Sequence, residues 1–344
     1  MSDTIPHSRP TLGGAEADAA ADAVRSGCVA AGERTAAFER ELARAVGLAG
    51  AVAASSGTAA LYAALRALGA GEGDEVLVPS FVCTALLHAT WAAGATPVVC
   101  DIHEDANLSA DAARANLTGR TAAIIVPHLF GKPAAIEPLL ELGPPVVEDC
   151  AQSLGAATGR AGACAVFSFY ATKMIATGEG GAVASDSREL LDRARDVIEY
   201  DKKSDARRRF NLKFNDIAAA IGRVQLSRLA GFVARRREIA DTYRRELDGL
   251  PGVALPDTTG SACFRYVIGV DDPEAVIASA ASKRVVLARP VTPPLHRVVG
   301  GECPDADRAF GRAVSLPIYP SLTEGAASRV VRAVREAVTG RSSS

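Results

Sequence analysis

The stretch PPVVEDCAQSLGA, residues 144–156, places an apolar run directly before two carboxylates. Its PVVED segment, like VVCDI (98–102) and AIIVP (123–127), is too uniformly apolar for a strand with one face in water. Strands buried on both faces are typical of a mostly parallel sheet covered by helices, so we expect an α/β fold. Strands are expected at 51–56, 74–80, 96–102, 122–131, 144–150 and 163–171.

The regions outside these strands indicate helices and a smaller second unit. Leu61, Leu65 and Leu68 recur at helical spacing, and one long helix is expected over 217–250, ended by Pro251-Gly252. The rest of the chain holds strand-like segments at 264–270 and 285–291, and helix-like segments at 273–282 and 326–338. We therefore expect a large α/β domain over residues 1–232 and a small α+β domain over 233–344.

The composition of the chain argues against several classes of partner and of location. The chain has 344 residues, with 38 Lys and Arg against 40 Asp and Glu, which argues against nucleic acid or an anionic membrane as main partner. No apolar run approaches the ~18 residues of a membrane-spanning helix. The first residues, MSDTIPHSRPTLGG, lack a basic and apolar leader pattern, so we expect a cytoplasmic protein. The 7 cysteines and 5 histidines are dispersed, without C-x-x-C or H-x-x-x-H pairs, so no metal site is expected.

Polar residues interrupt the pattern at strand ends, the edge where open α/β sheets bind ligands. SSGTAAL (55–61) opens a helix and fits either an anion site or an ordinary Ser/Thr cap. Glu148-Asp149 ends a buried strand, where a carboxylate either meets a cation or protonated heterocycle, or caps a helix. Lys173, five residues after Ser168, is either a carbonyl-reactive amine of lowered pKa or a surface lysine.

A further polar segment, RRRFNLKFND (207–216), places Asn211 and Lys213 in an apolar frame, after three arginines that normally form a solvated face. Together these segments supply a phosphate cradle, an acid for a pyridinium nitrogen, an amine for a carbonyl and a serine for a second phosphate contact. Those are the groups needed to hold pyridoxal 5'-phosphate (PLP).

The order of the motifs points to one family. They are GDEVLVPSF, GATPVVCDI, RTAAIIVPHLFGKP, VVEDCAQSLGA, VFSFYATKMIATGEGGAV, AAAIGRVQLSRL, RRREIADTYRREL, PPLH and SLPIYPSLTE. With them, from about Leu12 to Val338, the sequence resembles the DegT/DnrJ/StrS family of PLP-dependent sugar aminotransferases. The resemblance implies fold type I, with a mostly parallel seven-stranded sheet in the large domain and a small α+β C-terminal domain.

The resemblance also implies a role for each motif residue. Lys173 would bond to the cofactor's aldehyde carbon and, once released, move the proton between substrate and cofactor. Asp149 would bind the pyridinium nitrogen, and Gln152 would contact the phenolic oxygen of the ring. Asn211 would reach the cofactor phosphate of the neighbouring subunit in a homodimer with shared active sites. The phosphate would be held by the amides of Gly57, Thr58 and Ala59 and by the hydroxyl of Ser168.

Three departures from the family pattern leave parts of the site open. Cys83 occupies the position that commonly holds a ring-stacking aromatic, so either Cys83 or Phe81 faces the ring. Lys213 replaces the usual arginine, so either Asn211 or Lys213 crosses the dimer interface. IEYDKKS (198–204) replaces the R-x-H-G segment, and the C-terminal region is short; both regions usually shape the substrate pocket.

The implied function is transfer of an amino group, from glutamate, to a keto group of a nucleotide-linked sugar or cyclitol in amino-sugar, polysaccharide or antibiotic biosynthesis. One alternative is a dehydratase of the same family, but those members typically replace the lysine with histidine, whereas this chain has Lys173. The other alternative is a regulatory relative, although a protein that acts only by binding has no need of a complete catalytic set of residues. His128, His296 and Tyr319 lie in family-like motifs, with either a substrate-contacting or a structural role. Arg207–Arg209 either contact a diphosphate or form a solvated loop.

Overall fold

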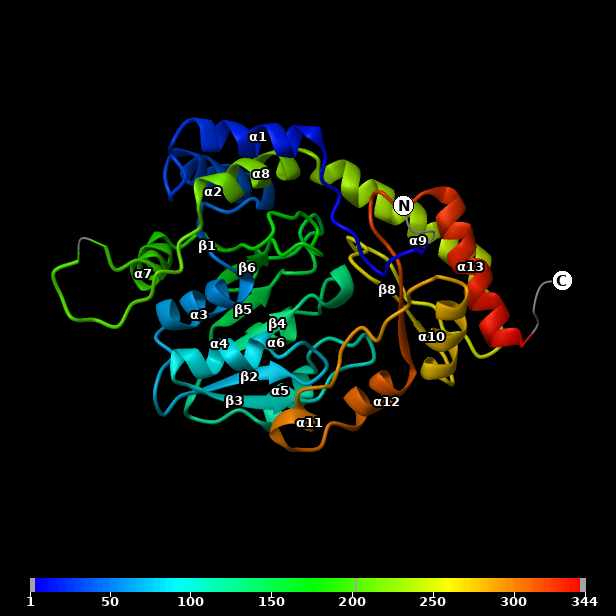
Figure 1. Ribbon diagram of the computed structural model, residues 1–344. Coiled ribbons are helices and arrows are strands. Elements are labelled where there is room, and N and C mark those ends of the chain that lie inside the picture. Colours follow the sequence, from blue (N-terminus) through cyan, green and yellow to red (C-terminus); the bar gives the residue numbers. More distant parts are fainter. Residues whose placement is uncertain (1–3, 202, 341–344) are drawn as a thin grey trace.

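The computed structural model describes residues 4–201 and 203–340, and its centre is a seven-stranded sheet (Figure 1). The strands are β1 (Gly50–Ala54), β2 (Glu75–Pro79), β3 (Thr96–Cys100), β4 (Thr121–Pro127), β5 (Val146–Asp149), β6 (Cys164–Ser168) and β7 (Gly181–Ser185). They lie in the order β1-β7-β6-β5-β4-β2-β3; β7 is antiparallel to β1 and β6, and the other pairs are parallel. The predicted fold class is therefore confirmed.

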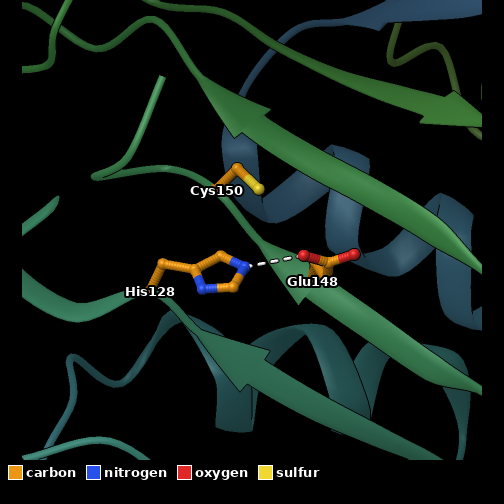
Figure 2. A group of neighbouring side chains, drawn as sticks. All are labelled: His128, Glu148 and Cys150. Carbon is orange, nitrogen blue, oxygen red and sulfur yellow. Dashed lines mark hydrogen bonds and ion pairs between the residues drawn. The ribbon is translucent and has the colours of Figure 1, made fainter. Parts of the chain in front are cut away.

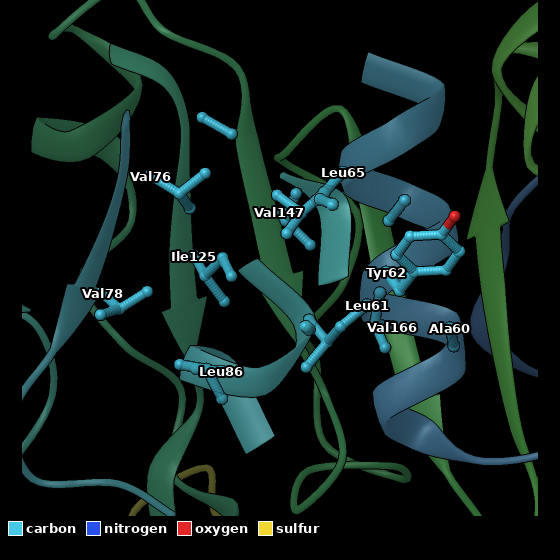
Figure 3. Packing of buried hydrophobic residues seen from close by; sticks show 14 of the residues in the cluster. Ala60, Leu61, Tyr62, Leu65, Val76, Val78, Leu86, Ile125, Val147 and Val166 are labelled. Atoms are coloured by element: carbon cyan, nitrogen blue, oxygen red, sulfur yellow. The ribbon is translucent and has the colours of Figure 1, made fainter. Parts of the chain in front are cut away.

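Helices cover both faces of this sheet, and further helices lie outside it in a smaller second core. They are α1 (Gly14–Arg25), α2 (Glu33–Val46), α3 (Gly57–Leu68), α4 (Ala85–Ala93), α5 (Ala110–Ala115), α6 (Glu137–Leu140), α7 (Arg188–Ile198), α8 (Asp216–Ser227), α9 (Leu229–Leu247), α10 (Pro273–Ser282), α11 (His296–Val299), α12 (Pro304–Arg312) and α13 (Glu324–Thr339), with a 3₁₀ turn at Leu129–Gly131. On β4, Ile125 packs in the cluster formed with α3, α4 and α7 (Figure 3), whereas Ile124 and Val126 pack on the opposite face with α5 and α6. This alternation explains why the strand sequences are apolar at successive positions.

The carboxyl ends of β1, β5 and β6 meet at one edge of the sheet because these strands run in the same direction. Asp149 is the last residue of β5, Ser168 the last of β6, and α3 begins at Gly57, shortly after β1. The topology thus brings three of the predicted motifs to a single edge.

A second, smaller core forms beside the large sheet, where α9, α10 and α13 pack around β8 (Tyr266–Gly269) and β9 (Ala313–Leu316). The strand expected over 285–291 is wrong, since that segment forms only single bridges, Ile5 with Val285 and Ala288 with Ser315. Pro290 interrupts the segment, because a proline cannot donate to a ladder. The division of the chain at residue 232 stays a prediction, and α9 runs across that position.

The single helix expected over 217–250 is also wrong. It is two helices, α8 and α9, which meet at Arg228 with a bend of 58°. Arg228 is held there by its bond to Glu16 (2.6 Å), and the Ser227 hydroxyl bonds back to the Val224 carbonyl (2.7 Å). Among the described residues no single helix is long and apolar enough to cross a membrane, although this bent pair passes that test when its halves are joined.

Candidate active site

The first part of the site is an anion cradle formed by the start of α3 and the end of β6. Ser56 caps α3 by accepting the N–H of Ala59 (3.0 Å), whereas the amides of Gly57 and Thr58 donate to none of the described residues. A Cβ atom at Gly57 would lie 2.8 Å from the Ser168 Cβ, so only glycine lets Ser168 sit over this helix end. Exposed N–H groups at a helix N-terminus beside a hydroxyl suit a phosphate. The Ala59 amide, also predicted to hold phosphate, is instead used by the cap.

Asp149 supplies a carboxylate without a cation partner. Its Oδ1 accepts the N–H of Ala151 (3.0 Å), and no lysine, arginine or histidine of the described residues forms an ion pair with it. Burial raises the pKa of Asp149, and the Ala151 amide and the nearby Lys173 partly offset this shift. A protonated ring nitrogen would supply the missing charge, so this residue fits the cofactor's pyridinium.

Lys173 supplies the amine. The backbone N–H of Lys173 donates to the Tyr170 carbonyl (2.8 Å). Its half-buried side chain places Nζ 5.4 Å from the centroid of the Phe264 ring. Burial lowers the pKa of Lys173, Cys83 and Asp149 oppose that shift, and Arg265 adds to it. A lysine with a lowered pKa is more often a neutral amine, which is the form that attacks a carbonyl carbon.

Gln152 is oriented by a hydrogen bond that fixes which end of its amide faces the site. Its Oε1 accepts the backbone N–H of Phe130 (2.8 Å), a group that can only donate. Phe130, the donor, has a positive φ of 60°. The NH₂ of Gln152 donates to none of the described residues, so it can donate to a phenolate oxygen as predicted.

The two candidates for the ring-facing position differ in surroundings. Phe81 is buried (1% exposed) and packs edge-on against Phe130, with centroids 6.3 Å apart. Cys83 is exposed and lies close enough to Lys173 to influence its pKa. Cys83 therefore has the more open position beside the Lys173 amine.

The two candidates for the dimer contact also differ. The segment before α8 pairs with the strand leading to the cradle, through the Lys213–Ala54 bridge and the Ser55 N–H bond to the Leu212 carbonyl (2.7 Å). The Lys213 ammonium is bound by Asp201, whereas Asn211 is exposed and its side chain bonds to none of the described residues. Of the segment 198–204, Lys202 lies outside the described residues.

His128, Glu148 and Cys150 form a buried group whose ligand-type atoms lie within 4.8 Å of one another (Figure 2). The atoms a metal would need are already used. His128 Nδ1 accepts the N–H of Ala134 (3.0 Å), so its Nε2 carries the proton donated to Glu148 (2.8 Å). Each Glu148 oxygen accepts two bonds, the other donors being the amides of Gly159, Ala161 and Gly162, each at 2.7 Å. The group is a structural network beneath Asp149.

Replacing His128 by leucine is expected to lower the free energy of unfolding by roughly 3 kcal/mol. The substitution leaves one lone pair of the Glu148 carboxylate and the Ala134 N–H unsatisfied inside the protein. Urea unfolding of the wild type and variant measures the effect. His88→Leu, at an exposed histidine, is the control and should change stability by less than about 0.5 kcal/mol. Equal effects of the two substitutions would contradict this interpretation.

His296 and Tyr319 also have structural surroundings. His296 is buried, its Nδ1 lies 2.6 Å from the Ser80 hydroxyl, and its Nε2 lies 3.2 Å from Asp307. It thereby ties the end of β2 to α12. Tyr319 packs in the smaller core.

The arginine triplet is largely paired with acids. Arg209 binds Asp196 (3.0 Å) and Asp205, and these bonds raise the pKa of Arg209. Arg207 lies 3.9 Å from Asp205, and the Arg208 guanidinium lies over Phe210. The triplet thus has partners in its own loop and in α7.

Sequence reasoning missed residues of α9 and of the segment before β8 that gather around the Phe264 ring, next to Lys173. The Phe264 ring is contacted by Lys173 and also by two arginines, with the Arg265 Cζ 5.3 Å and the Arg236 Cζ 6.0 Å from its centroid. Arg236 is buried and donates to the carbonyls of Phe264 (3.1 Å) and Ile318 (2.7 Å). The FRYVIGV pattern indicated only a strand, since nothing local marks these side chains as neighbours of Lys173.

The chain is similar to several known proteins along nearly its whole length. The spore coat polysaccharide biosynthesis protein SpsC of Bacillus subtilis is 31% identical, over 98% of this chain and 97% of that protein. The dTDP-4-dehydro-2,3,6-trideoxy-D-glucose 4-aminotransferase of Saccharopolyspora spinosa is 32% identical, over 96% of each chain. The crystal structure of DesV from S. venezuelae has a TM-score of 0.89 and 34% identity, over 93% of each chain.

A protein-family model matches most of the chain. The model of the DegT/DnrJ/EryC1/StrS aminotransferase family matches residues 10–335. This match confirms the predicted resemblance, and with it an aminotransferase that uses pyridoxal phosphate. The curated and structural relatives support a role in sugar amination. The chain therefore belongs to the DegT/DnrJ/EryC1/StrS aminotransferase family.

Proposed function

We propose that this protein transfers an amino group from an amino acid, glutamate in the first instance, to a keto group of a nucleotide-linked sugar. The observation that carries the proposal is that the Asp149 carboxylate, which accepts the Ala151 N–H and forms no ion pair among the described residues, lies close enough to Lys173 for their charges to interact. Burial lowers the pKa of Lys173 and raises the pKa of Asp149. An amine and an uncompensated carboxylate at one sheet edge are the groups that a carbonyl-bearing heterocycle needs. The relative from S. spinosa, a sugar 4-aminotransferase, supports a nucleotide-linked acceptor.

Each residue of the site would act on a defined atom. When bound, pyridoxal phosphate supplies a carbonyl carbon and a ring that accepts electrons. The Gly57 and Thr58 amides and the Ser168 hydroxyl hold the phosphate. Asp149 keeps the proton on the ring nitrogen, and the Gln152 NH₂ donates to the phenolic oxygen. Lys173 would bind the carbonyl carbon of the group and, as a free amine, would take the proton from the substrate carbon.

We infer that two chains share their active sites in a homodimer, with Asn211 as the residue that crosses. Asn211 is the exposed candidate of the pair, because the Lys213 ammonium is bound by Asp201 within its own chain. Cys83 rather than Phe81 would face the cofactor ring, since Phe81 is buried against Phe130.

The acceptor class is tested by converting the cofactor to its amino form with glutamate, removing the products, and adding keto sugars. A dTDP-linked 4-keto sugar is expected to restore the absorption of the aldehyde form, and the same sugar without its nucleotide is expected to do so at least about 100-fold more slowly, because remote binding energy is lost. Equal rates with both sugars, or no response to any nucleotide-linked keto sugar, would overturn the proposed acceptor.

A further inference from the structure

Arg265 is the unpaired cation of a cavity next to the site. The cavity, of about 700 Å³, lies where the large sheet meets the smaller core and is lined by Phe81, Phe130 and Arg265 among others. The other lysine and arginine side chains that line it are paired with aspartates: Lys132 with Asp257 (2.9 Å), Arg308 with Asp305 (2.6 Å) and Arg312 with Asp271 (2.8 Å). Among the described residues, no carboxylate forms an ion pair with Arg265.

The neighbours of Arg265 leave its charge uncompensated. Its Nη1 lies 3.2 Å from Nε2 of His7, which also lies 2.9 Å from the Ser315 hydroxyl. Burial and the Arg265 charge lower the pKa of His7 to about 4, so the imidazole is neutral at pH 7. Burial also lowers the pKa of the half-buried Arg265. A guanidinium partly removed from water without a counter-ion is costly, and an anionic ligand would lower that cost.

The position of Arg265 relative to Lys173 indicates which part of a substrate it could contact. Both cations lie against the Phe264 ring, at 5.3 and 5.4 Å from its centroid. The backbone N–H of Arg265 donates to the Phe130 carbonyl (3.2 Å), and the backbone N–H of Phe130 donates to the Gln152 side chain. Arg265 therefore lies on the Gln152 side of the site, whereas the phosphate cradle lies at Gly57 and Ser168.

We propose that Arg265 binds the α-carboxylate of the amino donor. This inference rests on the proposed function, because the donor's amine takes the place of Lys173 and its carboxylate is attached to the adjacent carbon. A guanidinium binds a carboxylate through two parallel N–H bonds, which also fixes the orientation of the Cα–H bond toward Lys173. Arg265 thus selects α-amino acids over simple amines as donors.

The test compares Arg265→Gln, Arg265→Lys and the control Arg308→Gln, an exposed, ion-paired arginine of the same cavity, in the PLP-loaded protein. For Arg265→Gln, the half-saturating concentration of L-glutamate in the half-reaction is expected to rise about 10- to 150-fold, and for Arg265→Lys by less. Arg308→Gln should stay within about twofold. With 4-aminobutyrate, which has no α-carboxylate, Arg265→Gln should match the wild type.

Calorimetric binding of glutarate to the same loaded proteins gives a readout that needs no turnover. Wild type and Arg308→Gln are expected to bind glutarate at least about tenfold more tightly than Arg265→Gln. Equal glutarate or glutamate affinities in wild type and Arg265→Gln would overturn the inference and leave the proposed function intact. A loaded wild type that binds glutarate through Arg265 but shows no spectral response to any amino acid would instead contradict the proposed function. If Arg265→Gln fails to fold, the Arg265→Lys comparison decides.

Discussion

Replacement of Lys173 by alanine is expected to lower turnover by at least about 10⁴-fold, because one side chain provides both the covalent attachment and the proton transfer. The variant should still take up cofactor, since the Gly57 and Ser168 cradle and Asp149 are unchanged. Two measurements test this: steady-state amination rates, and the protein mass after borohydride reduction, which retains the cofactor in the wild type and loses it in the variant.

Lys132→Ala is the matched control for this experiment. Lys132 lies in the neighbouring cavity and is bound by Asp257 at 2.9 Å, so its removal should leave both the rate and the reduced mass of the loaded protein as in the wild type. A Lys173→Ala protein that still carries reduced cofactor would show that another lysine is the reactive one. An unchanged rate would contradict the assignment of the whole site.

The central sheet and one edge of the site could be predicted from the sequence because local patterns determine them. Uniformly apolar runs can be satisfied only by burial on both faces, and Ile124 and Ile125 on β4 indeed enter different clusters. Polar residues at the ends of such runs, Asp149 and Ser168, then lie at the same edge because their strands are parallel.

The helix bend and the remaining part of the site could not be predicted, because they depend on contacts between segments that are distant in sequence. The pattern through Arg228 is continuous with a helix, whereas the structure bends there, and at the bend Arg228 bonds to Glu16, more than 200 residues away in sequence. Similarly, Phe264 and Arg265 lie far from Lys173 in sequence, and Phe264 reaches it by packing in the same cluster as Met174 and Ile175. A periodicity pattern describes one element and carries no information about which element it will meet.

Replacement of Asp149 by asparagine is expected to lower turnover by about 10³-fold while the protein still folds and carries cofactor on Lys173. Asparagine has nearly the same shape and keeps the bond to the Ala151 amide, but it has no charge to hold a proton on the ring nitrogen. Without that proton the ring accepts electrons poorly, so the loss falls on the proton-transfer step. Single-turnover rates with glutamate measure it, and Asp257→Asn, at an exposed aspartate, is the control.

The stability of the same variant separates this explanation from a general loss of structure. Because burial raises the pKa of Asp149 above its unfolded value, the unfolded chain ionises first as pH rises. The wild type without cofactor therefore loses stability between the ordinary pKa near 4 and the raised one, and the deficit persists at pH 7. Asp149→Asn has no such group, so without cofactor it should be at least as stable at pH 7 and should gain less from added PLP. A variant that is less stable without cofactor would show that Asp149 is structural, because its charge would then be compensated by the protein itself.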